Sequence, residues 1–236
     1  FNDAPADNDP LTVAAAGNGF LLRQGYTLVW SGWQGDLLPG GGLLGTDLPE
    51  AFTYGKRLQG LVRQEFIAER AGVLSMPLSG AANIRSYPAL DLDSSHATLT
   101  VRERERDVRT PVTPDDWAFA SAEMVDGTVQ ERPSPTDCYI RGGFRPGWIY
   151  ELIYQTEGSR VMGLGIVSIR DLVSMLRHES VDADGAPNPL AGYVDHAYIY
   201  GQSLSARVVR QFIYDGYNID PDGRRVFDAA YTHVSG

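Results

Sequence analysis

The chain has a single cysteine, Cys138, and no apolar run of the length that a bilayer requires. With one cysteine no intrachain disulfide can form, so the thiol content does not reveal a redox compartment. Cys138 is expected to be a small buried hydrophobe rather than a nucleophile. A membrane-spanning helix needs about 20 consecutive apolar residues, so we predict no membrane span. The sequence does not identify a cellular compartment, and it is compatible with a cytoplasmic, periplasmic or secreted protein.

Positive charge is also scarce, with 20 Lys and Arg residues against 30 Asp and Glu residues and a formal net charge of −10. Nucleic-acid-binding proteins usually gather positive charge on one face, so the composition disfavours that class of partner. Arginines at 102, 104 and 106 alternate with Glu103 and Glu105, which is typical of a solvated strand face with cross-strand ion pairs.

Metal-ligand spacings are absent as well. The Asp-rich segments 182–185 and 218–223 resemble calcium loops but lack the glutamate that closes an EF-hand. We therefore predict turns in both places, no metal site and no cofactor.

The sequence does contain enough apolar residues, 43% of 236, for one substantial core. Asp9 and Pro10 can begin a helix that ends at Gly25. Apolar stretches at 26–30, 148–155 and 193–200 predict strands, and the helical spacing within 166–177 predicts a helix between the last two. This alternation indicates an α/β fold with a mainly parallel sheet and flanking helices.

A different pattern occupies the middle of the chain. Apolar and polar residues alternate over 61–69, 96–106 and 117–122, and Pro, Gly or Asp bounds each segment. We predict a β-rich insertion over 55–141 within a single domain that spans 1–236. Such an insertion is a candidate rim or lid over a site.

The most informative segment is the passage from the strand at 193–200 into a helix that begins just after Ser203. Gly201 and Ser205 are small residues on either side of Ser203, as in the strained turn that presents a catalytic serine. The Leu204 amide and the helix dipole could then stabilise an oxyanion. The alternative is that Ser203 simply caps the helix.

A second oxyanion donor is predicted in the glycine-rich loop after the strand at 26–30. Hydrolases with this kind of serine turn take their second donor from the loop after an early strand, and Trp33, Gln34 and Gly35 occupy that position here. Trp33 and Gln34 are also candidates for lining an acyl pocket. The alternative is an ordinary glycine-rich turn with Trp30 and Trp33 packed in the core.

Two segments, WSGWQGDL at 30–37 and the stretch 200–236, resemble a family of bacterial α/β-hydrolase domain proteins. Members carry a G-F-S-Q-S-G-R segment, a helix, a G-F-N turn, a G-R-x-V-F-D segment and an H-x-x-G strand end. The chain keeps the serine and the arginine as Ser203 and Arg207, and it departs from the first segment at Gln202, Leu204 and Ala206. The resemblance implies an α/β-hydrolase fold and serine-hydrolase chemistry without a named substrate.

The same resemblance implies that a base and an acid should follow the serine, in the order Ser, Asp or Glu, His. The chain does not begin with Met, and we expect a piece truncated at both ends that lacks the usual histidine. His233, on the next predicted strand at 226–234, is the best candidate base within the chain. The alternative is that His233 only lines the pocket. Arg207 is expected to be structural and to pair with Asp36 or Asp228.

These observations predict a serine hydrolase that cleaves small-molecule carboxylic esters through an acyl-enzyme on Ser203. Two alternatives stay open: a hydrolase-like scaffold without turnover, and an acyltransferase or amidase on the same fold. The oligomeric state is not predicted.

Overall fold

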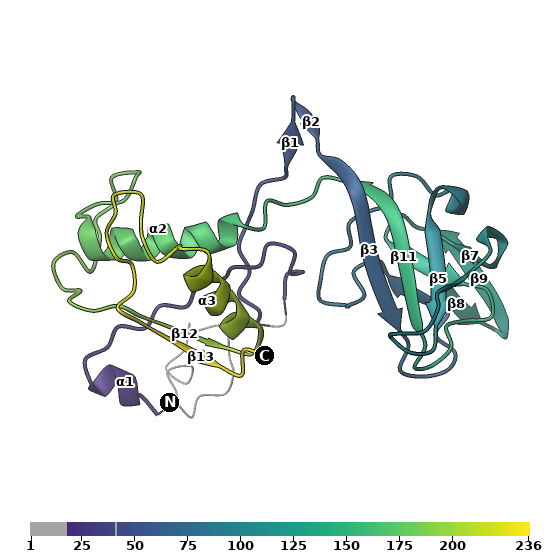
Figure 1. Cartoon of the computed structure of the whole chain (residues 1–236), viewed down its shortest axis with the longest axis horizontal. Coiled ribbons are helices and arrows are strands. Elements are labelled where there is room, and N and C mark those ends of the chain that lie inside the picture. The colour runs from purple at the N-terminus through teal and green to yellow at the C-terminus, as the bar shows by residue number, and fades with distance from the viewer. Residues whose placement is uncertain (1–17, 41) are drawn as a thin grey trace. The chain divides into compact units, whose positions relative to one another are not determined.

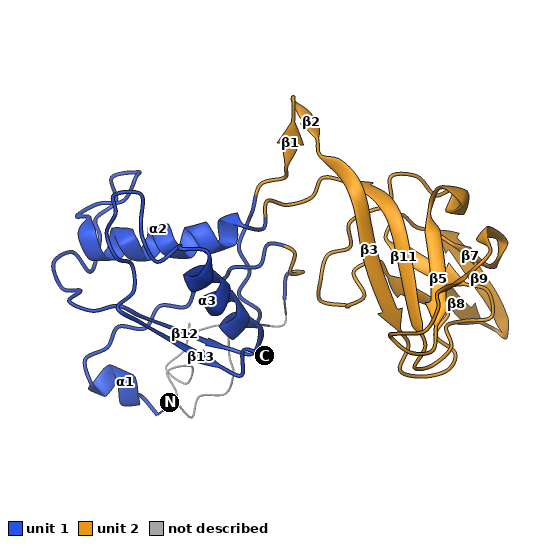
Figure 2. Ribbon diagram, in the orientation of Figure 1, with its two compact units in different colours: residues 1–35, 39–48, 162–236 blue, residues 36–38, 49–161 orange. Residues whose placement is uncertain are grey.

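The structure is a computed structural model that describes residues 18–40 and 42–236 (Figure 1). The chain forms two compact units (Figure 2). The first, here called the α/β unit, comprises the described residues of 1–35, 39–48 and 162–236. The second, here called the β unit, comprises residues 36–38 and 49–161. Each unit has its own cluster of buried apolar side chains.

The β unit is built around the long antiparallel pair of β3 (Gln59–Ile67) and β11 (Ile149–Glu157). Strand β11 also pairs with β5 (Thr98–Arg102), and β5 pairs with β6 (Thr110–Pro111), which gives the sheet order β3-β11-β5-β6. Alternate side chains of a strand point to opposite faces of the sheet. Tyr150, Leu152 and Tyr154 accordingly lie in the core of this unit.

Shorter strands complete the β unit. A three-stranded sheet contains β4 (Ser75–Pro77), β10 (Asp137–Ile140) and β7 (Trp117–Ala118). Two hairpins join β8 (Ala120–Val125) to β9 (Thr128–Pro133), and β1 (Phe52–Thr53) to β2 (Lys56–Arg57). Single turns of 3-10 helix occupy Ser94–His96 and Pro114–Asp116.

Strands are confirmed within the segments predicted at 61–69 and 117–122, as β3 and the β7 and β8 region. The segment predicted at 96–106 is a strand only over Thr98–Arg102, which is β5. The predicted insertion 55–141 falls inside the β unit, and its role as a rim or lid stays a prediction. Burial of Cys138 is also confirmed, because its side chain is completely enclosed and desolvation raises the pKa of its thiol.

The predicted placement of the strand at 148–155 in a parallel sheet is wrong. The strand exists as β11, but both of its neighbours, β3 and β5, run antiparallel to it. The cause is visible in its alternation: Glu151 lies between the core residues Tyr150 and Leu152. Strands buried on both faces of a parallel sheet read as continuous apolar runs instead.

Glu151 is the centre of a buried ion-pair network on the other face of this sheet. Its carboxylate accepts hydrogen bonds from Arg63 at 2.8 Å and from Arg109 at 2.8 Å, and it lies 3.4 Å from Nη1 of Arg102. Arg102 is therefore buried rather than part of the solvated face that the sequence predicts, and, among the described residues, the predicted cross-strand ion pairs are confirmed for Arg102 alone. Residues 103–106 form a turn after β5 and not a strand face. The hydrogen bond from Arg109, followed by those of Arg63, lowers the pKa of Glu151 to about 2.

We predict that Glu151→Gln lowers the free energy of unfolding at pH 7 by about 3 kcal/mol, because it removes the buried carboxylate that the buried Arg102 shares with the half-exposed Arg63 and Arg109. An unfolded glutamate has a pKa of about 4.3. A carboxyl group with a depressed folded pKa stabilises above its unfolded value, and this contribution is lost as the pH falls from about 4.3 toward 2. Urea unfolding across this range should show the loss in the wild type and a flatter profile in Glu151→Gln.

Glu123→Gln is the matched control, since Glu123 pairs with Arg132 on the surface. Exposed pairs contribute about 0 to 1 kcal/mol. Equal effects of the two substitutions would contradict the network.

The α/β unit contains three helices and one parallel pair of strands among its described residues. Its elements are α1 (Phe20–Arg23), α2 (Leu164–His178), β12 (Tyr198–Gln202), α3 (Leu204–Tyr214) and β13 (Ala229–His233). Strands β12 and β13 run parallel, with Tyr198 opposite Ala229 and Gln202 opposite His233. Ile169 of α2 and Phe212 of α3 pack with Val226 and Phe227 in its core.

Several predicted elements of this unit differ from the structure. The helix at 166–177 is confirmed as α2, but most of the helix predicted from Asp9 to Gly25 lies outside the described residues, and the described part is α1. Residues 26–30 and 193–197 are not strands. An extended apolar segment becomes a strand only when a neighbouring backbone pairs with it, and sequence periodicity does not reveal that neighbour.

The predicted mainly parallel sheet is not what the structure describes. Among the described residues the β12–β13 pair is the one parallel ladder, and the larger sheets are antiparallel. The β-strand, helix and β-strand unit around Ser203 is therefore the part of the expected architecture that the structure contains.

Candidate active site

The candidate site begins at Ser203, which joins β12 to α3. Its backbone angles are φ 54° and ψ −117°. A non-glycine residue in such a sparsely populated region costs about 1 to 3 kcal/mol and persists only when its surroundings hold it there. Ser203 is the N-cap residue of α3, yet its side chain makes no capping hydrogen bond, and the residue is exposed. The structure therefore does not describe a serine whose role is to cap the helix.

Backbone contacts on both sides hold this turn. The Ser203 amide donates to the carbonyl of His233 at 2.9 Å, and the Ser203 carbonyl accepts from the Arg207 amide at 3.2 Å. A Cβ atom on Gly201 would lie 2.5 Å from the carbonyl oxygen of Ser205. Only glycine at position 201 permits this close approach of β12 and α3, which explains the small residue before the serine.

Leu204 is the first residue of α3. The first amides of a helix have no intrahelical acceptor, and the helix dipole places partial positive charge beside them. Leu204 thus offers an N–H donor next to Ser203, while its side chain is exposed. This geometry suits the predicted oxyanion donor.

The loop Trp33–Gly35 lies in the same unit but packs against other elements. The Trp33 side chain packs against the core cluster of Ile169 and Phe212. The Gln34 carbonyl accepts from the Thr46 amide at 3.1 Å, and Gly35 lies against Leu48, whose Cδ1 would be 2.7 Å from an added Cβ. Trp33 is therefore packed against the core, as the alternative to an oxyanion loop expects, whereas Trp30 is exposed. The role of the loop as second oxyanion donor stays a prediction.

The backbone of His233 lies beside Ser203, because its carbonyl accepts a hydrogen bond from the Ser203 amide. Its ring is parallel to that of Tyr231, with the centroids 6.4 Å apart, and the residue is exposed. Within the described part of the chain, no hydrogen bond joins its ring to the Ser203 hydroxyl. The assignment of His233 as the base therefore stays a prediction.

The predicted pairing of Arg207 with Asp228 is wrong. Asp228 lies before β13, at the opposite end of the strands from Ser203, and it contacts Arg177 at 3.2 Å. Its carboxylate also accepts from the Ala197 amide, and this hydrogen bond, with the charge of Arg177, lowers the pKa of Asp228. Sequence spacing could not show which arginine reaches this end of the strands.

Sequence reasoning also missed the strain at Val234, directly after β13. Its φ of 51° is unusual for a β-branched residue. Because the His233 carbonyl accepts from the Ser203 amide, the two strained residues follow neighbouring strands at the same edge. No sequence signal marks Val234, since valine normally avoids this conformation.

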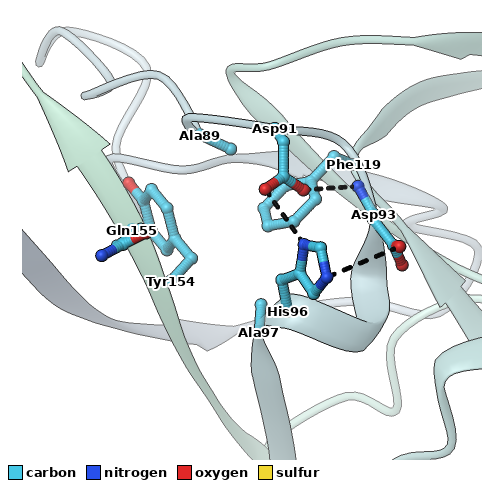
Figure 3. Close-up of a pocket in the computed structure, with 8 residues that line it drawn as sticks. All are labelled: Ala89, Asp91, Asp93, His96, Ala97, Phe119, Tyr154 and Gln155. Carbon is cyan, nitrogen blue, oxygen red and sulfur yellow. Dashed lines mark hydrogen bonds and ion pairs between the residues drawn. The ribbon is translucent and has the colours of Figure 1, made fainter.

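Two hollows in the β unit are poor alternatives to the Ser203 site. One of about 20 Å³ has room for about one water molecule. In it the His96 ring lies between the carboxylates of Asp91 and Asp93, and its hydrogen bond with Asp91 raises the pKa of His96 (Figure 3).

The other hollow, of about 410 Å³, lies between residues 70–75 and 122–124. Its serine, Ser75, is hydrogen-bonded to both the amide and the carbonyl of Ala122.

Among the described residues, no group of three or more His, Cys, Asp or Glu side chains is placed to hold a metal ion. No described helix is both long enough and apolar enough to cross a bilayer.

A strand, a tight turn at a serine and a helix, set beside a parallel strand, form the arrangement that α/β hydrolases share. Residues 150–236 match the sequence family described as "Alpha/beta hydrolase domain". The match covers the segment 200–236 and confirms the resemblance there, and it indicates a hydrolase-like domain. The segment 30–37 lies outside the match. No curated protein and no solved structure matches the chain.

Proposed function

We propose that the protein is a serine hydrolase that cleaves carboxylic esters, with Ser203 as the nucleophile. The observation that carries the proposal is the strained backbone of Ser203 without a capping hydrogen bond. Strain of this kind clusters at functional sites. The match of residues 150–236 to the hydrolase family supports the class of chemistry.

In the proposed reaction the Ser203 hydroxyl attacks the ester carbonyl and transfers its proton to a base. The Leu204 amide, and an amide of the Trp33–Gly35 loop, stabilise the oxyanion of the tetrahedral intermediate. The alcohol leaves with a proton, and water then hydrolyses the acyl-enzyme. We assign the base role to His233, because it is opposite Gln202 in the β12–β13 register and so lies next to Ser203.

The proposal is tested with a panel of 4-nitrophenyl esters on the native protein. Ser203→Ala should abolish turnover, because no other group supplies the nucleophile. Ser205→Ala is the matched control, since Ser205 is an exposed serine of the same turn, and it should retain most activity. Equal turnover in wild type and Ser203→Ala would reject the proposal. Added alcohol tests the alternative of acyl transfer, which would give a new ester in place of the free acid.

A non-catalytic scaffold is the second candidate function. The described residues place no ring nitrogen within hydrogen-bond distance of the Ser203 hydroxyl, and this observation favours it. An absence of turnover with every ester, together with an unreactive Ser203, would support the scaffold.

A further inference from the structure

We propose that Arg207 binds a carboxylate on the substrate, so that the site prefers esters that carry a free carboxylate. This inference rests on the proposed function of Ser203. It names the class of substrate, and it assigns Arg207 a role in specificity rather than in the bond-making steps.

Arg207 lies one helical turn after Ser203. Their backbones are joined by the hydrogen bond between the Arg207 amide and the Ser203 carbonyl. Helical side chains tilt toward the helix N-terminus. The Arg207 stem therefore extends back over the first turn, toward Ser203.

The Arg207 guanidinium group lies beside Gly236. A Cβ atom on Gly236 would lie 3.2 Å from Nη2 and 3.4 Å from Nε of Arg207. Gly236 follows His233 by three residues, and the His233 carbonyl accepts from the Ser203 amide. The guanidinium group thus lies at the same edge of the strands as the candidate nucleophile.

Among the described residues, no Asp or Glu side chain forms an ion pair with Arg207. Arg210, one turn further along α3, donates to the main-chain oxygen of Gly236 at 2.6 Å. Within the described part of the chain, the Arg207 guanidinium group therefore has no acidic side chain as its partner.

The chemistry of the guanidinium group selects the ligand. Its planar fork donates two parallel hydrogen bonds to a carboxylate. Because Arg207 is exposed, solvent and salt weaken the interaction, and we expect a preference of about fivefold rather than the larger factor of a buried pair.

The test compares 4-nitrophenyl hydrogen succinate with 4-nitrophenyl butyrate on the native protein, because these esters share a leaving group and an acyl chain length. Arg207→Gln should reduce the ratio of their kcat/KM values by about fivefold. Arg207→Lys, which keeps the charge, should restore part of the ratio. Acetoxybenzoate and phenyl acetate form a second pair. Both are acetyl esters, and only acetoxybenzoate carries a carboxylate, which lies on its leaving group. A preference within this pair would show that Arg207 recognises a carboxylate on the alcohol part of the ester.

Arg225→Gln is the matched control. Arg225 is also exposed, and it precedes β13 at the end of the strands away from Ser203. The control should leave both ratios unchanged.

The outcomes separate the two proposals. Ser203-dependent turnover with the same ratios in wild type, Arg207→Gln and Arg207→Lys overturns this inference and leaves the proposed function standing. Loss of Ser203-dependent turnover for all four esters overturns both. If Arg207→Gln does not fold, the test uses the wild type and Arg207→Lys. In that case the inference is overturned if the ratio of the kcat/KM values does not change with salt and is the same in Arg207→Lys as in the wild type.

Discussion

Gly201→Ala should lower the free energy of unfolding by about 3 kcal/mol and remove the reactivity of Ser203. The added Cβ would lie 2.5 Å from the carbonyl oxygen of Ser205 and 2.8 Å from the amide nitrogen of Ala206. Both are backbone atoms, so no side-chain rotation relieves the contact. The helix α3 must shift away from β12, and this shift moves the Leu204 amide relative to the serine hydroxyl.

Urea unfolding and ester turnover measure the two effects. Gly163→Ala is the control, because the space around Gly163 is open and its φ is −59°. We expect a change of less than about 0.5 kcal/mol in the control. Equal stability and activity of Gly201→Ala and wild type would show that β12 and α3 do not approach as closely as the structure describes.

Gly165→Ala should also be strongly destabilising, by about 3 kcal/mol. Gly165 lies in the first turn of α2, where alanine normally favours the helix by up to about 1 kcal/mol. The structure reverses this expectation, because an added Cβ would lie 1.9 Å from the carbonyl oxygen of Trp33. Either α2 or the Trp33–Gly35 loop must move.

The measurement is urea unfolding of Gly165→Ala beside Gly163→Ala, two residues earlier. If Trp33–Gly35 supplies the second oxyanion donor, ester turnover should fall even under conditions where Gly165→Ala remains folded. A stabilising effect of Gly165→Ala would contradict the contact between α2 and the Trp33 backbone.

For some elements, the periodicity of apolar residues in the sequence is sufficient to predict the type of element and its buried face. The helical spacing of 166–177 and the alternation of 61–69 reveal which face of each element is apolar, and both elements exist as α2 and β3. The turn at Ser203 is also marked in the sequence, because small residues flank the serine where the period changes from strand to helix.

The partners of each element could not be predicted in the same way. The apolar residues of 148–155 are as compatible with an antiparallel sheet as with a parallel one, and β3 and β5 decide between them. The packing of Trp33 on α2 and α3 depends on a contact across more than 130 residues of sequence. Asp228 meets Arg177 rather than Arg207 for the same reason, because the fold brings α2 to that end of the strands.

Reaction of the native protein with a fluorophosphonate, followed by peptide mass mapping, tests the central claim most directly. A hydroxyl that is held ready for attack forms a covalent phosphonyl adduct, whereas an ordinary surface serine does not. The account predicts one adduct, located on Ser203 and absent from Ser203→Ala. An adduct on another serine, or no adduct at all, would contradict it.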